Sequence, residues 1–119
     1  MRYLLVLLLF ISVYGCRNFS AKDLPPGLTG DSIIPEKEMI RMMAEVHVIE
    51  TGIQMERNKN KETKPLQQFY YNQLFSHYKT SETRFRNNLL YYQANPDKFK
   101  KMYDDVVTSI DSMRKSVKP

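Results

Sequence analysis

The sequence predicts an all-α fold, a small antiparallel bundle of three to four helices that follows an apolar N-terminal segment and a flexible tether. Apolar residues recur every three or four positions, which is the spacing of one helix face. Prolines and capping residues stand where these segments begin. No run of β-branched residues alternates with polar ones, and no Asn-Gly or Asp-Gly hairpin turn occurs, so strands are not expected.

Composition limits both the size of the protein and its partners. The chain has 119 residues and a net charge of +5, which allows a single domain. Its basic residues are scattered and have acids close by, whereas nucleic-acid binding needs a dense basic stripe, so no nucleic acid is expected as a partner. The single cysteine has no partner for an intramolecular disulfide, and stability must therefore come from packing.

Residues 1–15 have the pattern of a signal peptide. Arg2 supplies a positive charge, and Leu4 to Val13 is apolar apart from Ser12. As a helix this run would rise about 15 Å, against a hydrocarbon core of roughly 30 Å. We therefore do not expect a permanent transmembrane anchor.

The cysteine directly follows this segment. Val13-Tyr14-Gly15-Cys16 resembles the bacterial lipobox at the branched aliphatic residue, at the small residue and at the cysteine. The resemblance implies a diacylglyceryl group on the Cys16 sulfur, cleavage before Cys16 and an acylated amine, with no other cofactor. The acid-rich stretch that marks surface export in such lipoproteins of Bacteroidetes does not follow Cys16. We therefore expect a cell-envelope protein anchored to the outer membrane, on its periplasmic face.

The rest of the chain divides into a tether over residues 16–33 and a helical domain over residues 34–119. The tether contains two prolines and two glycines and shows no sustained period. Pro35 is placed to be the first residue of a helix that runs to about Met55. Its apolar stripe consists of Met39, Met42, Met43, Val46, Ile49 and Ile53.

Three more helices are predicted after a wholly polar loop from Arg57 to Lys64. Pro65 begins a short aromatic helix, and Thr80 or Ser81 can cap the next one. Asn95, with Pro96 at the first helical position, begins a last helix whose apolar repeat reaches Val117. The short connections between these helices favour antiparallel neighbours.

Two tyrosine clusters place aromatic rings on more than one face of their helices. Such rings either wrap a small core with their hydroxyls in water or contact a protein partner. The candidate interface consists of Tyr70, Tyr71, Tyr91 and Tyr92.

A second candidate site is polar. His47 and Glu50 lie three residues apart on the first predicted helix, so they could share a proton or hold a ligand, unless His47 is a core-edge residue. A metal site needs three or four ligands, and the other histidine, His77, belongs to another helix, so no metal is expected. Phosphate loops, nucleophile elbows and paired-acid motifs are missing from the sequence, and we do not expect an enzyme.

Several segments resemble one known family. Ile33-Ile34-Pro35-Glu36-Lys37, then Val46-His47, then Tyr91-Tyr92-x-x-Asn95-Pro96 occur in the order seen in the domain of unknown function 4296 family of Bacteroidetes lipoproteins. The resemblance covers roughly Ile33 to Met113 and implies a cell-envelope lipoprotein of unassigned activity.

Three hypotheses for function follow from these observations. The first is a non-enzymatic module that binds a periplasmic or outer-membrane protein. The second is a holdase-like chaperone for envelope clients, which the methionine stripe favours because methionine adapts to varied surfaces. The third is a carrier of a small ligand or metal at His47 and Glu50. The sequence leaves open whether the bundle closes alone or forms a homo-oligomer.

Overall fold

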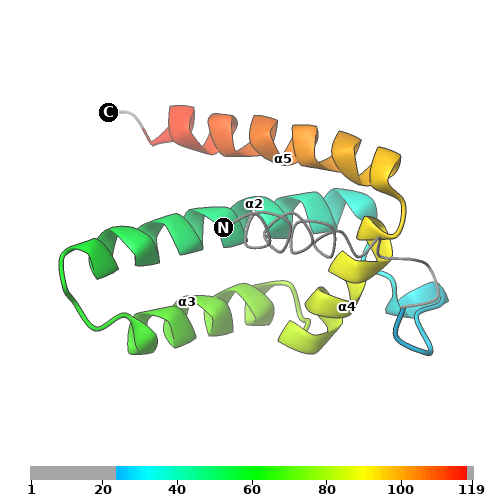
Figure 1. The fold of residues 1–119 in the computed structure, drawn as a ribbon, viewed down its shortest axis with the longest axis horizontal. Coiled ribbons are helices and arrows are strands. Elements are labelled where there is room, and N and C mark those ends of the chain that lie inside the picture. The colour runs from blue at the N-terminus through cyan, green and yellow to red at the C-terminus, as the bar shows by residue number, and fades with distance from the viewer. Residues whose placement is uncertain (1–23, 118–119) are drawn as a thin grey trace, which may run out of the picture.

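A computed structural model describes residues 24–117 of the chain. Four α-helices follow a short 3-10 turn, and no strand occurs in this part of the chain (Figure 1). The elements are η2 (Gly30–Ser32), α2 (Glu36–Asn58), α3 (Lys64–His77), α4 (Glu82–Gln93) and α5 (Pro96–Ser116). The predicted all-α class is confirmed. The predicted signal peptide, residues 1–15, and Cys16 lie outside the described residues.

Local capping explains where the last two helices begin. The Ser81 hydroxyl accepts a hydrogen bond from the Arg84 backbone N–H at 3.1 Å. The Asn95 side-chain oxygen accepts from the Lys98 N–H at 3.1 Å, and Pro96 is the first helical residue after it. These side chains satisfy backbone donors that have no partner within the helix. Both predicted starts are confirmed.

Two predicted boundaries were wrong by a few residues. Pro35 has an extended backbone, so it precedes α2, which begins at Glu36. The helix then continues to Asn58, and α3 begins at Lys64, which leaves a connection much shorter than the predicted loop. Glu56 pairs with Lys59 and Lys61 across this turn. Asn60 takes a left-handed conformation with φ of 59°, which asparagine tolerates and which ends the helix.

Helices α3, α2 and α5 form a layer with α2 in the middle. Helix α4 crosses this layer at one end (Figure 1). Helices α2 and α3 are antiparallel, as predicted. Helix α5, by contrast, runs in the same direction as α2, since Glu36 at the start of α2 pairs with Lys98 at the start of α5 at 2.9 Å. The direction differs from a uniformly antiparallel bundle because α4 crosses the layer near the end where α2 begins instead of running back along it, so α5 starts at that end.

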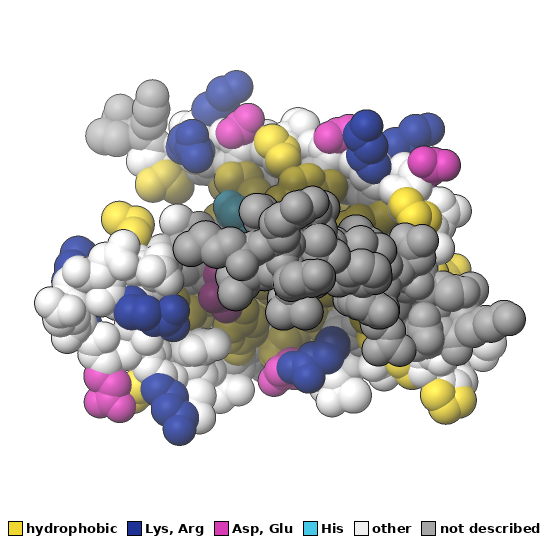
Figure 2. Space-filling model, viewed as in Figure 1, with side chains coloured by type: hydrophobic (Ala, Val, Ile, Leu, Met, Phe, Trp, Pro, Cys, Tyr) yellow, Lys and Arg dark blue, Asp and Glu magenta, His cyan; other side chains and the backbone are white. Residues whose placement is uncertain are grey.

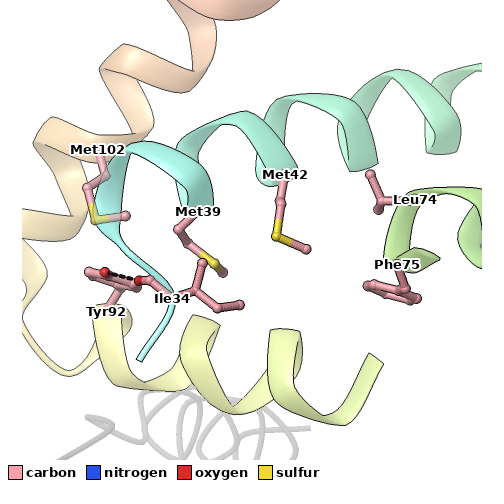
Figure 3. Close-up of a cluster of buried hydrophobic side chains, with 7 residues drawn as sticks. All are labelled: Ile34, Met39, Met42, Leu74, Phe75, Tyr92 and Met102. Atoms are coloured by element: carbon pink, nitrogen blue, oxygen red, sulfur yellow. Dashed lines mark hydrogen bonds between the residues drawn. The ribbon is translucent and has the colours of Figure 1, made fainter. Parts of the chain in front are cut away.

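The core is concentrated at the end of the layer that α4 covers. Figure 3 shows its buried side chains converging from all four helices and from the segment before α2; they are Ile34, Met39, Met42, Leu74, Phe75, Tyr92 and Met102. Within the predicted stripe of α2, Met39, Met42 and Ile53 are buried. Met43, Val46 and Ile49 are partly buried against the same cluster.

A buried amide attaches the segment before α2 to α4. Asn88 is completely buried, and its side-chain oxygen accepts a hydrogen bond from the Ile34 backbone N–H at 2.7 Å. Its amide nitrogen donates to the carbonyls of Ser32 at 3.0 Å and Arg84 at 2.9 Å. The Tyr92 hydroxyl donates to the Ile34 carbonyl at 2.5 Å (Figure 3). The last residues of the predicted tether are therefore an ordered part of the domain.

We expect Asn88→Leu to lower the free energy of unfolding by about 2 kcal/mol, because it leaves the buried Ile34 N–H without an acceptor. Chemical denaturation monitored by circular dichroism measures this loss. The neighbouring Asn87→Ala, at a half-buried position, serves as the control and should change stability by less than about 0.5 kcal/mol. Equal effects of the two substitutions would contradict the role given to Asn88.

Candidate functional site

The structure separates the four predicted interface tyrosines. Tyr92 is 4% exposed and belongs to the core, so the expectation that it contacts a partner was wrong. Its hydroxyl donates a hydrogen bond to the Ile34 carbonyl, and burial raises the pKa of the phenol. Tyr91 is half-buried and packs edge-on against Tyr92, with ring centres 5.1 Å apart. Tyr70 is 44% exposed and is the most accessible of the four.

Tyr71 stabilises the pairing of α3 with α2. Its hydroxyl donates a hydrogen bond to the Glu50 carboxylate. The hydroxyl of Tyr78, at the C-terminal end of α3, donates to the Glu45 carboxylate at 2.6 Å. Desolvation of the phenols, together with the adjacent carboxylates, raises the pKa of both tyrosines. Both hydroxyls therefore remain protonated donors at neutral pH, and Tyr71 is engaged within the chain.

The predicted polar site is not assembled. Glu50 is exposed and accepts from Tyr71 on the α3 side of α2. His47 is exposed on the other side, where it faces α5. His77 packs edge-on against Tyr78, with ring centres 4.9 Å apart. Within residues 24–117, no group of three or more histidine, cysteine, aspartate or glutamate side chains is arranged to hold a metal ion.

An accessible apolar surface lies elsewhere, on the half of α2 that α4 does not cover. Val48 is 48% exposed, Met55 is 58% exposed, and Gly52 lies between them on the same side of the helix. This side is opposite to the one that carries Met39 and Met42 into the core, given about 100° per residue. We call this surface the open face; it consists of Val48, Gly52 and Met55 on α2, Leu66 and Tyr70 on α3, and Ile110, Met113 and Val117 at the end of α5.

Two shallow grooves run along the open face, one on each side of the α2 ridge. The groove between α2 and α5 has a volume of about 560 Å³, and the groove between α2 and α3 about 490 Å³. Both are lined by Val48, Gly52 and Met55. In the view of Figure 2, charged side chains of both signs follow the outer edges of the molecule, and apolar side chains are visible inside these edges.

The two grooves differ in charge. His47 and Arg114 line the groove next to α5. Glu56 lines the groove next to α3, and Glu45 lies further along the same side, close to His77. Hydrogen bonds from Lys59 and then Lys61 lower the pKa of Glu56 to about 2, so this carboxylate is ionised at neutral pH. The groove next to α5 is thus lined by basic side chains, whereas the carboxylate in the groove next to α3 is paired with two lysines of the chain.

Periodicity did not predict this surface, because the apolar residues of α2 fall on two opposite faces and only the core stripe has regular spacing. The feature of the sequence that could have drawn attention to this surface is Gly52, a glycine in the interior of a helix. A Cβ atom built at this position meets nothing within 4 Å, so no contact within the described chain requires glycine. A glycine in a helix interior costs about 0.5–1 kcal/mol relative to alanine.

Comparison with known proteins places the chain in a family. A family model described as a domain of unknown function, DUF4296, matches residues 31–116. The chain is a DUF4296 protein. The matched range begins just before the Ser32–Ile34 segment held by Asn88 and ends with α5, so the DUF4296 domain and the helical domain coincide. Neither a curated protein nor a solved structure significantly matches the chain.

Among the residues that the structure describes, none forms a helix with both the length and the apolar character needed to cross a membrane.

The ionised Glu56 predicts a local pH dependence. Because the folded pKa lies below the usual value of 4.5, the stabilisation of the turn after α2 is present above about pH 4.5 and is lost as the pH falls towards 2. Carbon-detected NMR titration of the Glu56 carboxyl should show a midpoint near 2. Replacing both Lys59 and Lys61 by alanine should return the midpoint towards 4.5; a midpoint near 4.5 in the unmodified chain would contradict the pairing.

Proposed function

We propose that this protein is a lipid-anchored, non-enzymatic helical module of the bacterial cell envelope that binds a protein partner on its open face. The anchor is Cys16, and the site is the periplasmic face of the outer membrane. The open face carries the proposal, because it is a continuous apolar surface that the described chain leaves uncovered.

An aromatic pair extends the open face at its α3 edge. Phe69 and Tyr70 are 57% and 44% exposed, and their rings meet edge to face with centres 5.5 Å apart. Tyr70 also lines the groove that contains Val48 and Met55. Exposed aromatic residues next to apolar grooves are typical anchors of protein interfaces, because they bury a large area with few rotatable bonds. This arrangement supports protein binding over the capture of a small ligand.

The lipid anchor follows from the lipobox resemblance of residues 13–16, in a chain whose family membership is shown only as a domain of unknown function. Each buried methylene contributes about 0.8 kcal/mol, so two or three acyl chains hold a protein firmly. The hydrogen bonds of Asn88 and Tyr92 to Ser32 and Ile34 attach the tether end of the domain to α4. The predicted tether therefore joins the domain at the end where α2 begins.

The other two functional hypotheses have less support. Holdase activity was suggested by the methionines of the first helix, but Met39 and Met42 are completely buried and Met43 is partly buried. A ligand or metal carrier would use His47 and Glu50 together, yet these side chains face different neighbours, α5 and Tyr71. Protein binding at the open face is the function that the geometry supports best.

We expect the double substitution of Phe69 and Tyr70 by serine to reduce partner recovery by about 30-fold, because interface anchors contribute about 2 kcal/mol or more. Recovery is measured by crosslinking in intact cells, purification through a C-terminal tag and abundance-normalised mass spectrometry. Tyr103→Ser is the matched control, since Tyr103 is 50% exposed and does not line the open face. Unchanged recovery, with unchanged thermal melting of the double variant, would contradict the proposal.

The anchor has an independent test. Cys16→Ser should leave an uncleaved precursor and abolish labelling of the protein by an alkyne fatty acid in growing cells. Labelling that persists in this variant would contradict lipidation at Cys16.

A further inference from the structure

We propose that the partner lays an amphipathic helix in the groove between α2 and α5, with an apolar stripe against the groove and acidic side chains towards Arg114. This inference rests on the proposed function, that the open face binds protein, and specifies the chemistry of the partner.

The walls of the groove match the periodicity of a third helix. The α2 wall runs from His47 to Met55, and the α5 wall from Ile110 to Val117, so each wall spans two helical turns. Helices α2 and α5 are paired at their N-terminal ends and diverge towards their C-terminal ends (Figure 1). A helix that lies between two others contacts both through residues three and four positions apart. An amphipathic helix of about three turns therefore fits the groove.

The lining of the groove is mostly apolar and accessible to solvent. Val48 and Met55 on α2 are 48% and 58% exposed, and Val117 at the end of α5 is 80% exposed. Ile110 and Met113 complete the lining on the α5 side. An apolar stripe on the partner removes these side chains from water. Because they line a groove between two helices, a rod reaches more of them than a flat membrane surface does.

The free charge in the groove is positive. Arg114 lines the groove and belongs to none of the ion pairs formed within residues 24–117. From residue 112 to residue 117 the chain contains Arg114 and Lys115 and no acidic residue. His47 lies on the opposite wall, and an imidazole donates a hydrogen bond to a carboxylate whether or not it is charged.

The carboxylates on the α3 side of the open face do not compensate this charge, because they are engaged within the chain. Glu56 is paired with Lys59 and Lys61, and Glu45 accepts a hydrogen bond from the Tyr78 hydroxyl. Complementary charge across an interface selects the partner and its orientation. The partner helix is therefore expected to carry aspartate or glutamate next to its apolar stripe.

Peptide binding to the full-length chain tests the inference. The chain is held in nanodiscs of neutral phosphatidylcholine, and the probe is a fluorescein-labelled peptide of about 18 residues, or about five turns, with leucines at helical spacing flanked by glutamates. This peptide should bind about tenfold more tightly than the same peptide with lysines in place of the glutamates. A scrambled acidic peptide of equal composition should lose binding, because it has no apolar stripe.

Substitution of Arg114 tests the charge. Arg114→Glu should lower the affinity for the acidic peptide by about tenfold and raise the affinity for the lysine peptide, whereas Arg114→Lys should retain most of the binding. Lys115→Glu is the matched control, since it makes a similar charge change at the next residue, which is exposed and does not line the groove. It should change the affinity by less than about twofold.

Substitution of Gly52 tests the location. A Cβ atom at this position meets nothing within 4 Å, so the side chain of Gly52→Leu enters the groove and not the core. The affinity should fall by about tenfold, with an unchanged or higher thermal midpoint because leucine favours a helix over glycine. Gln54→Leu adds the same side chain at an exposed position of α2 that does not line the groove, and should bind the peptide normally.

The outcomes distinguish the inference from the proposed function. Equal affinities for the acidic and lysine peptides, unchanged binding in Arg114→Glu or Gly52→Leu, or an absence of peptide binding overturn the inference. Recruitment of phosphatidylglycerol vesicles without peptide binding also overturns it and assigns the open face to a membrane. If Arg114→Glu and Gly52→Leu retain partner recovery in intact cells while the Phe69 and Tyr70 double variant loses it, protein binding stands and the acidic helix fails.

Discussion

The structure depends on the hydrogen bonds that the buried amide of Asn88 makes to the segment before α2. They satisfy the backbone of Ser32 and Ile34 at a place where water is excluded, and so allow Ile34 to enter the core. An unpaired backbone group at this depth would cost as much as several apolar contacts provide. Tyr92 adds a second side chain from α4 to the same segment. The helix α4 is thereby held across the start of α2.

This placement of α4 determines the rest of the architecture. Because α4 crosses the layer, α5 begins beside the start of α2 and runs parallel to it, with Lys98 paired to Glu36. The same crossing gathers the core at one end of the layer. The other half of α2 is flanked by α3 and α5 but covered by neither, and its second apolar side, at Val48 and Met55, is left exposed.

Some of the tyrosines and charged side chains hold the helices of the layer together, whereas others lie on its surface. Tyr71 and Tyr78 donate to Glu50 and Glu45, which attaches α3 along α2. Tyr70, next in sequence to Tyr71, lines the open face instead. The open face thus combines an apolar ridge with basic side chains, His47 and Arg114, along its α5 side.

The sequence by itself determined the features that depend on near neighbours in the chain. Helix starts at Ser81 and Asn95 follow from hydrogen bonds within four residues, and the all-α class follows from apolar spacing. Short ordered motifs in the sequence likewise indicated the family, which a family model over residues 31–116 shows. Only the tertiary structure decided that Tyr92 is buried while Tyr70 is exposed, that α5 runs parallel to α2, and that Gly52 lies on an open face. Burial and direction depend on which side of a helix meets a segment more than 50 residues away, as in the contact of Asn88 with Ile34, and periodicity carries no information about that choice.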